Sequence, residues 1–248
     1  MDEAPGTILT EPGRRHLTVT DEELDHIRER YERRKTLAPD LYSFTRPEVL
    51  RGVQSVDRAT MSLLVGAGLT DLAGLRLLEV GCGTGGNLLR FLRWGFRPEN
   101  LVGNDLLADR VEQARRVLPR DVTLTAGDAR DLDDGGPFDI VYQSTVLSSI
   151  LDDEVQRSVA DRMWQLTRPG GVVLSYDFVF DNPRNPDVRK VPVSRLRQLF
   201  PEGMVTTRRV TLAPPIARRA ARLGPAFSAL EALPFLRTHV VALISKPT

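Results

Sequence analysis

The chain has 248 residues, of which 41% are hydrophobic and 27% charged, and its net charge is +1. This length suits one large α/β domain or two small ones, no apolar run reaches the ~20 residues that span a bilayer, and the N-terminus lacks the pattern of a signal peptide. The single cysteine, Cys82, excludes an intramolecular disulfide and a cysteine-based zinc cluster. We therefore expect a cytoplasmic protein with no metal centre and no transmembrane segment.

The charge is unevenly distributed along the chain. Residues 184–248 hold 12 Lys and Arg against 3 Asp and Glu, a balance of +9, so the rest of the chain carries −8. A basic C-terminal third suits an anionic substrate, a nucleic acid or an acidic membrane, and it suits equally a proteome rich in arginine. Because the segment lacks interleaved aromatic residues that would stack on bases, we expect no nucleic-acid partner.

Two helices are predicted near the N-terminus. Residues 1–19 are broken by proline and glycine, and Thr20 is suited to cap a helix that starts with acidic residues and ends with basic ones. A second helix is expected from about Arg46 to Ala67, with Pro47 in its first turn. The first part of the chain is therefore expected to be helical.

From residue 75 the hydrophobic period changes to that of a strand-and-helix alternation. Short apolar strands are expected at 75–80, 100–105, 122–128, 138–144 and 172–178. Helices are expected between them at 87–94, 107–118 and 152–167. This alternation predicts an α/β fold with a doubly wound, mostly parallel sheet and helices on both faces.

The regular alternation of predicted strands and helices ends after Phe180. Residues 181–192 are rich in proline and asparagine and should form a loop, followed by a short helix at 194–200. Two further strands are expected at 203–213 and 238–246. The segment between these strands is largely helical and is interrupted by Gly224 and Pro225.

The glycine-rich stretch "EVGCGTGG" joins the first strand to the next helix and fits two ligand-binding patterns. Gly81, Gly83 and Gly86 match G-x-G-x-x-G, a dinucleotide fingerprint. Glu79, Gly81, Gly83 and Gly85 match E-x-G-x-G-x-G, a turn that holds S-adenosylmethionine (SAM). Glycine lets a ligand approach the backbone, and a helix N-terminus attracts the anionic group of either ligand. The turn alone therefore leaves NAD, SAM and an unliganded structural turn open.

Two acids at the ends of the next strands extend the pattern. Asp105 ends the second strand, where a carboxylate can accept both ribose hydroxyls, or can cap the following helix. Asp128 ends the third strand, where a carboxylate can accept the adenine amino group, or can be a solvated loop acid. Three successive strands that end in nucleotide-compatible features are far more specific than any one of them.

A short-chain reductase is the main NAD-dependent alternative. Tyr31 and Lys35 match its Tyr-x-x-x-Lys pair, but in such enzymes the pair follows the fifth strand, whereas here it precedes the glycine turn. We interpret Tyr31 and Lys35 as helix surface.

Together these motifs resemble the class I SAM-dependent methyltransferases over roughly residues 75–180, and less specifically the bacterial small-molecule and surface-glycan methyltransferases. The resemblance implies a Rossmann-like, seven-stranded sheet with an antiparallel last strand. It implies a helical lid in residues 1–70 and a SAM-binding domain in 71–248, with substrate-pocket insertions in 181–236.

The resemblance also implies roles for individual residues. Glu79 would lie near the methionine amino group of SAM, and Gln143 and Ser144 would border the transferred methyl. The full set of implied cofactor-binding residues is Glu79, Gly81, Cys82, Gly83, Gly85, Asp105, Leu106, Asp128, Ala129, Gln143 and Ser144.

Candidates for the chemistry lie after the fourth and fifth strands. Asp177, Tyr176 and Gln143 are the catalytic candidates, although Asp177 is equally readable as a hydrogen-bonded loop acid. The substrate-binding candidates are Thr145, Tyr176, Arg184 and Arg189. His16, His26 and His239 are interpreted as structural or exposed, with the two N-terminal ones able to reach the site from the lid. The N-P-P-Y/F signature of amino and amide acceptors is absent, and "YQST" takes its place.

These features predict a SAM-dependent methyltransferase that acts on a small molecule, at oxygen before nitrogen or carbon. The substrate could be anionic or lipid-linked, because Arg218, Arg219 and Arg222 share a helix face that suits an anionic membrane as well as plain solvent. Two alternatives stay open, a SAM-binding fold recruited to cyclase or decarboxylase chemistry and a non-catalytic binding partner. Homodimerisation also stays open.

Overall fold

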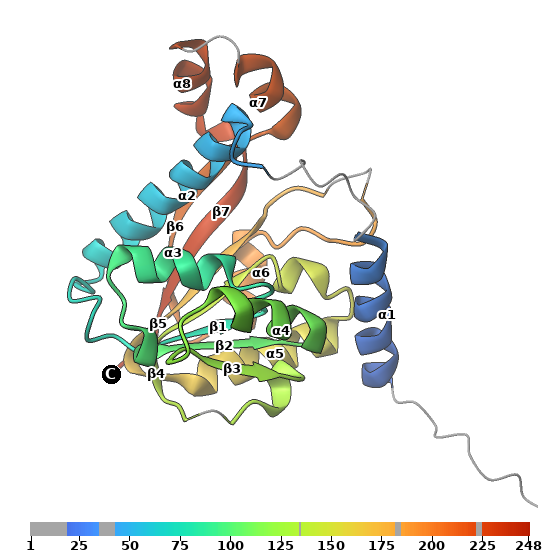
Figure 1. Ribbon diagram of the computed structural model, residues 1–248. Coiled ribbons are helices and arrows are strands. Elements are labelled where there is room, and N and C mark those ends of the chain that lie inside the picture. Colours follow the sequence, from blue (N-terminus) through green and yellow to red (C-terminus); the bar gives the residue numbers. More distant parts are fainter. Residues whose placement is uncertain (1–18, 35–42, 134, 182–184, 222–224) are drawn as a thin grey trace, which may run out of the picture.

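The computed structural model describes residues 19–34, 43–133, 135–181, 185–221 and 225–248. Its centre is a seven-stranded sheet in the order β3-β2-β1-β4-β5-β7-β6 (Figure 1). The strands are β1 (Leu77–Val80), β2 (Leu101–Asp105), β3 (Thr123–Ala126), β4 (Phe138–Ser144), β5 (Thr167–Phe178), β6 (Met204–Leu212) and β7 (Arg237–Ser245). The first five strands are parallel, and β7 pairs antiparallel with both β5 and β6. The predicted sheet is therefore confirmed.

Helices cover both faces of this sheet, as the crossover rule requires. One hydrophobic cluster holds α1 (Val19–Arg34), α5 (Asp153–Leu166) and α6 (Val193–Leu199). A second cluster on the opposite face holds α2 (Pro47–Gly66), α3 (Gly86–Trp94) and α4 (Ala108–Val117). Successive residues of β5 alternate between them, with Val173 in the first and Leu174 in the second.

Local sequence explains where these elements begin and end. Every residue of β1 and β2 is buried, which is why both strands are continuous apolar runs. Helix α5 starts after Asp152, whose carboxylate accepts the backbone N–H groups of Glu154 and Val155. Helix α3 starts after Gly85 and ends before Gly95, and both glycines adopt the left-handed conformation.

The two N-terminal helices differ in how they join the domain. Helix α1 begins at Val19, so Thr20 lies inside it and not before it. Helix α2 places Val56, Leu63 and Leu64 in the cluster it shares with β1 and β4. Because α2 is built into this core, the domain boundary at residue 70 stays a prediction.

The far end of β6 and β7 carries a small satellite core. Helices α7 (Pro214–Ala220) and α8 (Pro225–Glu231) pack together beside the first turns of α2 (Figure 1). Leu212, Ala217, Ala220 and Phe227 form its buried centre. The predicted interruption is confirmed in that α8 starts at Pro225, while Gly224 lies outside the described residues. Among the helices the structure describes, none is long and apolar enough to cross a membrane.

Candidate active site

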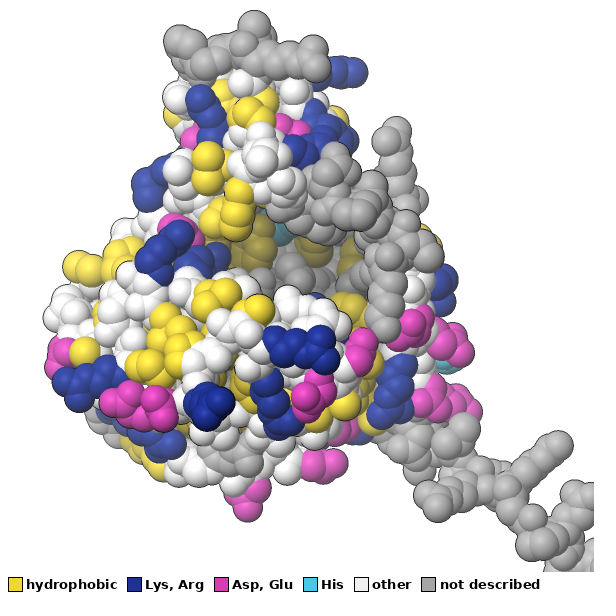
Figure 2. All heavy atoms as spheres, viewed as in Figure 1, with side chains coloured by type: hydrophobic (Ala, Val, Ile, Leu, Met, Phe, Trp, Pro, Cys, Tyr) yellow, Lys and Arg dark blue, Asp and Glu magenta, His cyan; other side chains and the backbone are white. Residues whose placement is uncertain are grey.

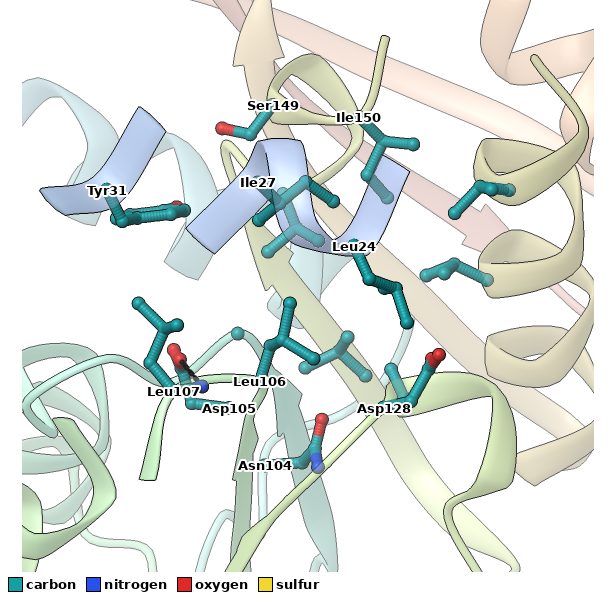
Figure 3. Close-up of a pocket in the computed structure, with 16 residues that line it drawn as sticks. Leu24, Ile27, Tyr31, Asn104, Asp105, Leu106, Leu107, Asp128, Ser149 and Ile150 are labelled. Atoms are coloured by element: carbon teal, nitrogen blue, oxygen red, sulfur yellow. Dashed lines mark hydrogen bonds between the residues drawn. The ribbon is translucent and has the colours of Figure 1, made fainter. Parts of the chain in front are cut away.

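A cavity lies at the carboxyl ends of β1, β2 and β3, where ligands bind in doubly wound sheets. Its floor comes from the strand ends and its roof from α1 (Figure 3). Five residues predicted to bind the cofactor line it: Gly81, Asp105, Leu106, Asp128 and Ala129. The structure thus brings together the three strand ends that the sequence singled out separately.

The glycine turn is shaped by close contacts that leave no room for side chains. Gly81 has φ +71°, and a Cβ there would lie 2.3 Å from Cγ2 of Val146. The turn is fixed to β2 because the N–H of Cys82 donates to the carbonyl oxygen of Asn104 at 2.8 Å. Cys82 itself is buried, and burial raises the pKa of its thiol, so it supports the turn as a neutral side chain.

The Asp105 carboxylate holds the glycine turn and the following loop in place through two backbone hydrogen bonds. Its Oδ2 accepts the N–H of Gly83 at 2.8 Å and its Oδ1 accepts the N–H of Leu107 at 3.0 Å. A carboxylate offers about four lone-pair sites, so both oxygens can still accept ribose hydroxyls. Asp105 does not cap α4, because its Oδ1 accepts the N–H of Leu107, the residue that precedes this helix, and the ribose interpretation stays compatible with the geometry.

Asp128 faces the same cavity and is paired with Arg130. Its Oδ2 accepts Nε and Nη2 of Arg130 at 2.9 and 2.6 Å, and its Oδ1 accepts the Arg130 N–H at 2.9 Å. Leu106 and Ala129 line the cavity beside it and offer apolar surface to a purine ring. This corner thus combines a fixed acceptor with apolar walls, as an adenine site requires.

The burial and the hydrogen bonding of the Glu79 carboxyl show whether the residues present fit SAM. Glu79 is fully buried; its Oε1 accepts Nδ2 of Asn87 at 2.6 Å, whereas its Oε2 has no hydrogen-bond partner among the described residues. Burial raises the pKa of this carboxyl to about 8. A cationic group beside Oε2 would satisfy the free oxygen and restore the charged form. The methionine ammonium of SAM is such a group, and the chain's residues fit it.

Helix α1 forms the roof of the cavity, and it lies in the segment, residues 1–70, for which the resemblance implied a helical lid. Leu24, Ile27 and Tyr31 point down toward Asp105 and Leu106 (Figure 3). The interpretation of Tyr31 as plain helix surface is therefore wrong, while its proposed partner Lys35 lies outside the described residues. No local pattern could reveal this docking, since α1 precedes the glycine turn by about fifty residues and contacts it only through the tertiary fold.

Two charged residues of α1 fasten the helix to the loop after β4. Glu23 and Arg30 form a buried ion pair at 2.7 Å. Glu23 Oε1 also accepts the N–H of Leu151 at 2.8 Å, and Arg30 Nη2 donates to the carbonyl oxygen of Ser149 at 3.1 Å. We name these two residues and their two backbone contacts the α1 clasp.

Gln143 and Asp177 form an enclosed network. Nε2 of Gln143 donates to Oδ2 of Asp177 at 2.5 Å and to the Ser175 hydroxyl at 2.6 Å. Gln143 Oε1 accepts the N–H of Val146, and Asp177 Oδ1 accepts the N–H of Ser148. Both side chains are fully buried, and burial raises the pKa of Asp177 to about 6. In this arrangement the two residues shape the loop after β4, and neither lines the described cavity.

The remaining acceptor-side candidates lie along the ends of β4 and β5. Ser144 and Thr145 are partly buried, and Thr145 has φ +58°, a strained value for a β-branched residue. The Tyr176 hydroxyl lies 3.1 Å from Oγ1 of Thr211, and burial raises the pKa of this phenol.

The predicted arginines do not meet at the cavity. Arg189 pairs with Asp153 at 2.6 Å at the start of α5, away from the cavity lining. Arg184 lies outside the described residues. Their role in binding a substrate stays a prediction. Across the ranges that the structure describes, no group of three His, Cys, Asp or Glu side chains could hold a metal ion.

Fold and site together define a nucleoside-binding α/β domain whose residues fit SAM. Residues 77–171 match the family model described as a methyltransferase domain. The chain is therefore similar, over these residues, to methyltransferase domains that use SAM, and its fold matches a methyltransferase structure solved with S-adenosyl-L-homocysteine.

Individual relatives agree with this assignment at different levels. The human thiol S-methyltransferase is 32% identical over 151 residues, which cover 58% of this chain and 59% of that protein. The N-methyltransferase NodS of Bradyrhizobium japonicum, solved with S-adenosyl-L-homocysteine, matches with a TM-score of 0.63 at 14% identity, covering 90% of this chain and 99% of that one. The [4+2]-cyclase SpnF matches with a TM-score of 0.55 at 21% identity, covering 79% and 83%. At these identities the two structures show the shared fold alone.

Proposed function

We propose that this protein transfers the sulfonium methyl of SAM to a small-molecule acceptor, at an oxygen atom in the first instance. The observation that carries the proposal is the set of ligand-compatible groups at three successive strand ends around one cavity. The free Oε2 of Glu79 adds to it, because a buried acceptor without a partner costs free energy until a ligand supplies one.

The chain's own residues would supply binding and alignment. Bound SAM supplies an already activated methyl group, so much of the acceleration can come from holding the acceptor in line and excluding water. The turn at Gly81 and Asp105 would hold the cofactor, and α1 would close over it through Leu24, Ile27 and Tyr31. On this ground we infer that α1, within the predicted lid segment 1–70, acts as a lid.

The acceptor atom is the finer part of the proposal. Oxygen is favoured over nitrogen because the segment at the end of β4, "YQST", lacks the motif typical of amino and amide acceptors. Sulfur enters as a further candidate, because the human relative is named as a thiol methyltransferase. Both atoms would react as X–H groups that must lose a proton, so the site needs a means of proton removal for either.

A panel of acceptors tests the proposal. The full chain is incubated with SAM and, separately, a phenol, an aryl thiol, a carboxylic acid, a sugar alcohol and a primary amine, and the products are analysed by mass. We expect one added methyl and one equivalent of S-adenosylhomocysteine with a phenol. Absence of methylated product from every acceptor, in a protein that binds SAM, would contradict the proposed activity.

Non-methylating chemistry is the second candidate function. It is favoured by the enclosure of Gln143 and Asp177, which leaves no carboxylate base open to the acceptor side among the described residues. The neighbouring fold of a [4+2]-cyclase is compatible with it. A product of unchanged mass, formed without release of S-adenosylhomocysteine, would establish this candidate in place of methyl transfer.

A further inference from the structure

Three side chains gather where β5 ends and β7 begins, outside the cavity described above. The His239 ring stacks on Tyr176 with centroids 5.1 Å apart and planes 8° apart, and it packs on Phe178 at 4.3 Å. Phe178 and His239 are direct partners in the antiparallel pairing. His239 therefore lies at the same edge of the sheet as the carboxyl ends of the parallel strands, which is the ligand-binding edge.

The hydrogen bonds around His239 are compatible with a ring that carries its proton on Nδ1. Oγ1 of Thr238 donates to the carbonyl oxygen of Thr211 at 3.3 Å and lies 3.0 Å from Nδ1 of His239. A hydroxyl has one hydrogen, so once Thr238 has donated to Thr211, Nδ1 must be the donor to Oγ1. This relay leaves a lone pair on Nε2, because the bond made by one ring nitrogen sets the state of the other.

The surroundings leave Nε2 free and the ring uncharged. No group in the described part of the chain forms a hydrogen bond with Nε2. Burial lowers the pKa of His239 to about 4. The titratable group that contacts the ring is the Tyr176 phenol, while Asp177, the next residue of β5, lies in the enclosed network with Gln143.

A strained residue on β6 holds this arrangement in place. Thr211 has φ +61°, which is costly for a β-branched side chain, and strain of this kind persists where the surroundings enforce it, often at functional sites. Its hydroxyl bonds that of Tyr176 at 3.1 Å, and its carbonyl accepts Thr238. Thr211 thus connects the phenol and the imidazole relay, and α2 passes beside it at Gly52.

The strand order fixes how far this cluster lies across the sheet from the end of β4. β7 is two places from β4 in the sheet, so at ~5 Å per strand His239 lies roughly 10 Å across the sheet from the strand that ends in Ser144. Figure 2 shows the molecule hollowed between the lobe of α2, α7 and α8 and the body below, with hydrophobic side chains in the hollow.

We propose that His239 is the catalytic base of the methyl transfer, acting through Nε2 on an acceptor with a weakly acidic O–H or S–H group on an apolar, preferably aromatic, body. In this step the acceptor proton moves to Nε2, the freed electron pair of oxygen or sulfur forms the bond to the methyl carbon, and the carbon–sulfur bond of SAM breaks toward sulfur. The products are the methylated acceptor, S-adenosylhomocysteine and an imidazolium that releases its proton to water. The proposal rests on the proposed function.

The acceptor class follows from the side chains present. The side chains that pack on the His239 ring, Tyr176 and Phe178, are aromatic, and neither carries a charge that would hold a phosphate or carboxylate. A carboxylate acceptor would also need no base at neutral pH. A phenol or thiol, by contrast, gains most from a neutral imidazole.

The tautomer is tested first, without any turnover. The chain has three histidines, so nitrogen NMR of the full chain with S-adenosylhomocysteine, compared with His239→Gln, assigns the ring of His239. We expect a neutral ring protonated at Nδ1 from pH 6 to 8. A ring protonated at Nε2, or one that is charged at pH 6, would overturn the proposal whether or not the protein transfers methyl groups.

Turnover tests the catalytic role with the phenols and aryl thiols of the panel. His239→Gln is expected to lower kcat about 100-fold and to leave the Kd for SAM within about two-fold, which separates loss of the base from loss of cofactor binding. Retention of more than half of kcat would overturn the proposal, and so would a wild-type protein that binds SAM and methylates only amines or carboxylates.

A second variant covers the case in which His239→Gln does not fold. Thr238→Val keeps the shape of the side chain and removes the relay hydroxyl, so kcat should fall about ten-fold, while Thr238→Ser should restore it. Equal activity of the Val and Ser variants would contradict the positioning role of Thr238 and with it the proposed tautomer.

Discussion

At the scale of single residues, the site is defined by buried polar groups that are only partly satisfied. Glu79 is the clearest example, since one oxygen is bonded to Asn87 and the other has no partner among the described residues. Asp105 and Asp128, in contrast, are bonded through both oxygens and hold their loops in shape. We infer that the free oxygen of Glu79 is available to a ligand, whereas Asp105 and Asp128 hold the loops of the binding site in shape.

Glu79 makes the stability of the cofactor-free protein dependent on pH. Its pKa is raised from 4.5 to about 8 on folding, so the folded state keeps its proton where the unfolded state has lost it. The contribution to stability is therefore full below about pH 4.5 and is lost as the pH rises toward 8. Glu79→Gln should raise the free energy of unfolding at pH 8, by on the order of 3–5 kcal/mol as an upper bound.

Thermal unfolding of both proteins from pH 5 to 8 measures this effect. Asp177 and His239 also titrate on unfolding, but they are present in both proteins, so the difference between the curves isolates Glu79. Saturating SAM should flatten the wild-type curve, because its ammonium favours the charged carboxylate. Parallel curves for the two proteins without cofactor would contradict this account of Glu79.

Substitution of Asp177 distinguishes a structural role of this residue from a catalytic one. Because it accepts bonds from Gln143 and from the N–H of Ser148, Asp177→Asn should cost about 1–3 kcal/mol of stability. We expect kcat/KM to stay within about ten-fold of wild type. A loss of a hundred-fold or more with unchanged stability would instead make Asp177 the base and would remove that role from His239.

At the scale of elements, α1 forms the roof of the cavity, and we propose that it acts as a lid. The α1 clasp joins it to the loop that Gln143 and Asp177 shape from below. The roof and the acceptor-side loop are thus physically connected. Because α1 side chains form the roof of the cavity, we infer that cofactor release requires the clasp to open.

Breaking the clasp should therefore speed release of the cofactor. Arg30→Gln leaves Glu23 buried without its partner, which costs roughly 3–5 kcal/mol locally, so the off-rate of SAM measured by stopped flow should rise at least ten-fold. The matched control is Arg28→Gln on the same helix, where the pair with Asp25 is exposed and worth less than about 1 kcal/mol. Equal off-rates for the two variants would show that the clasp does not hold the lid.

Helix α2 is expected to behave as core and not as a lid. Leu64 is fully buried against the sheet, so Leu64→Ala should lower the free energy of unfolding by about 2–5 kcal/mol. Its neighbour Val65 is 55% exposed, and Val65→Ala should change the free energy of unfolding by less than about 0.5 kcal/mol. Denaturant unfolding of both variants checks this, and a similar small effect in both would favour a lid that extends to residue 70.

At the scale of the whole molecule, the features that could be predicted from the sequence are those that local sequence patterns determine. The order of strands and helices follows from hydrophobic period, and Gly81, Asp105 and Asp128 were found because each stands at a strand end. The resemblance implied a helical lid within residues 1–70, but neither the side chains through which α1 docks nor the relay through Thr211 and Thr238 was predicted. Both depend on residues that are distant in sequence and meet only after the sheet has formed.

His239 illustrates the same limit. From the sequence alone, His239 is one histidine at the start of a predicted strand. It was therefore interpreted as a structural or exposed residue. Its stacking on Tyr176 and its bond to Thr238 appear only when β7 pairs antiparallel with β5. His26, in contrast, is exposed on α1 as interpreted, and His16 lies outside the described residues.

The central claim is that the cavity at the ends of β1, β2 and β3 binds SAM. Calorimetric titration of the full chain with SAM, beside Asp105→Ala and the exposed-loop control Asp121→Ala, tests it most directly. We predict one site in the wild type and the control, and a loss of about 2–4 kcal/mol of binding free energy in Asp105→Ala. Absence of binding by the wild type, or equal binding by all three proteins, would contradict the claim.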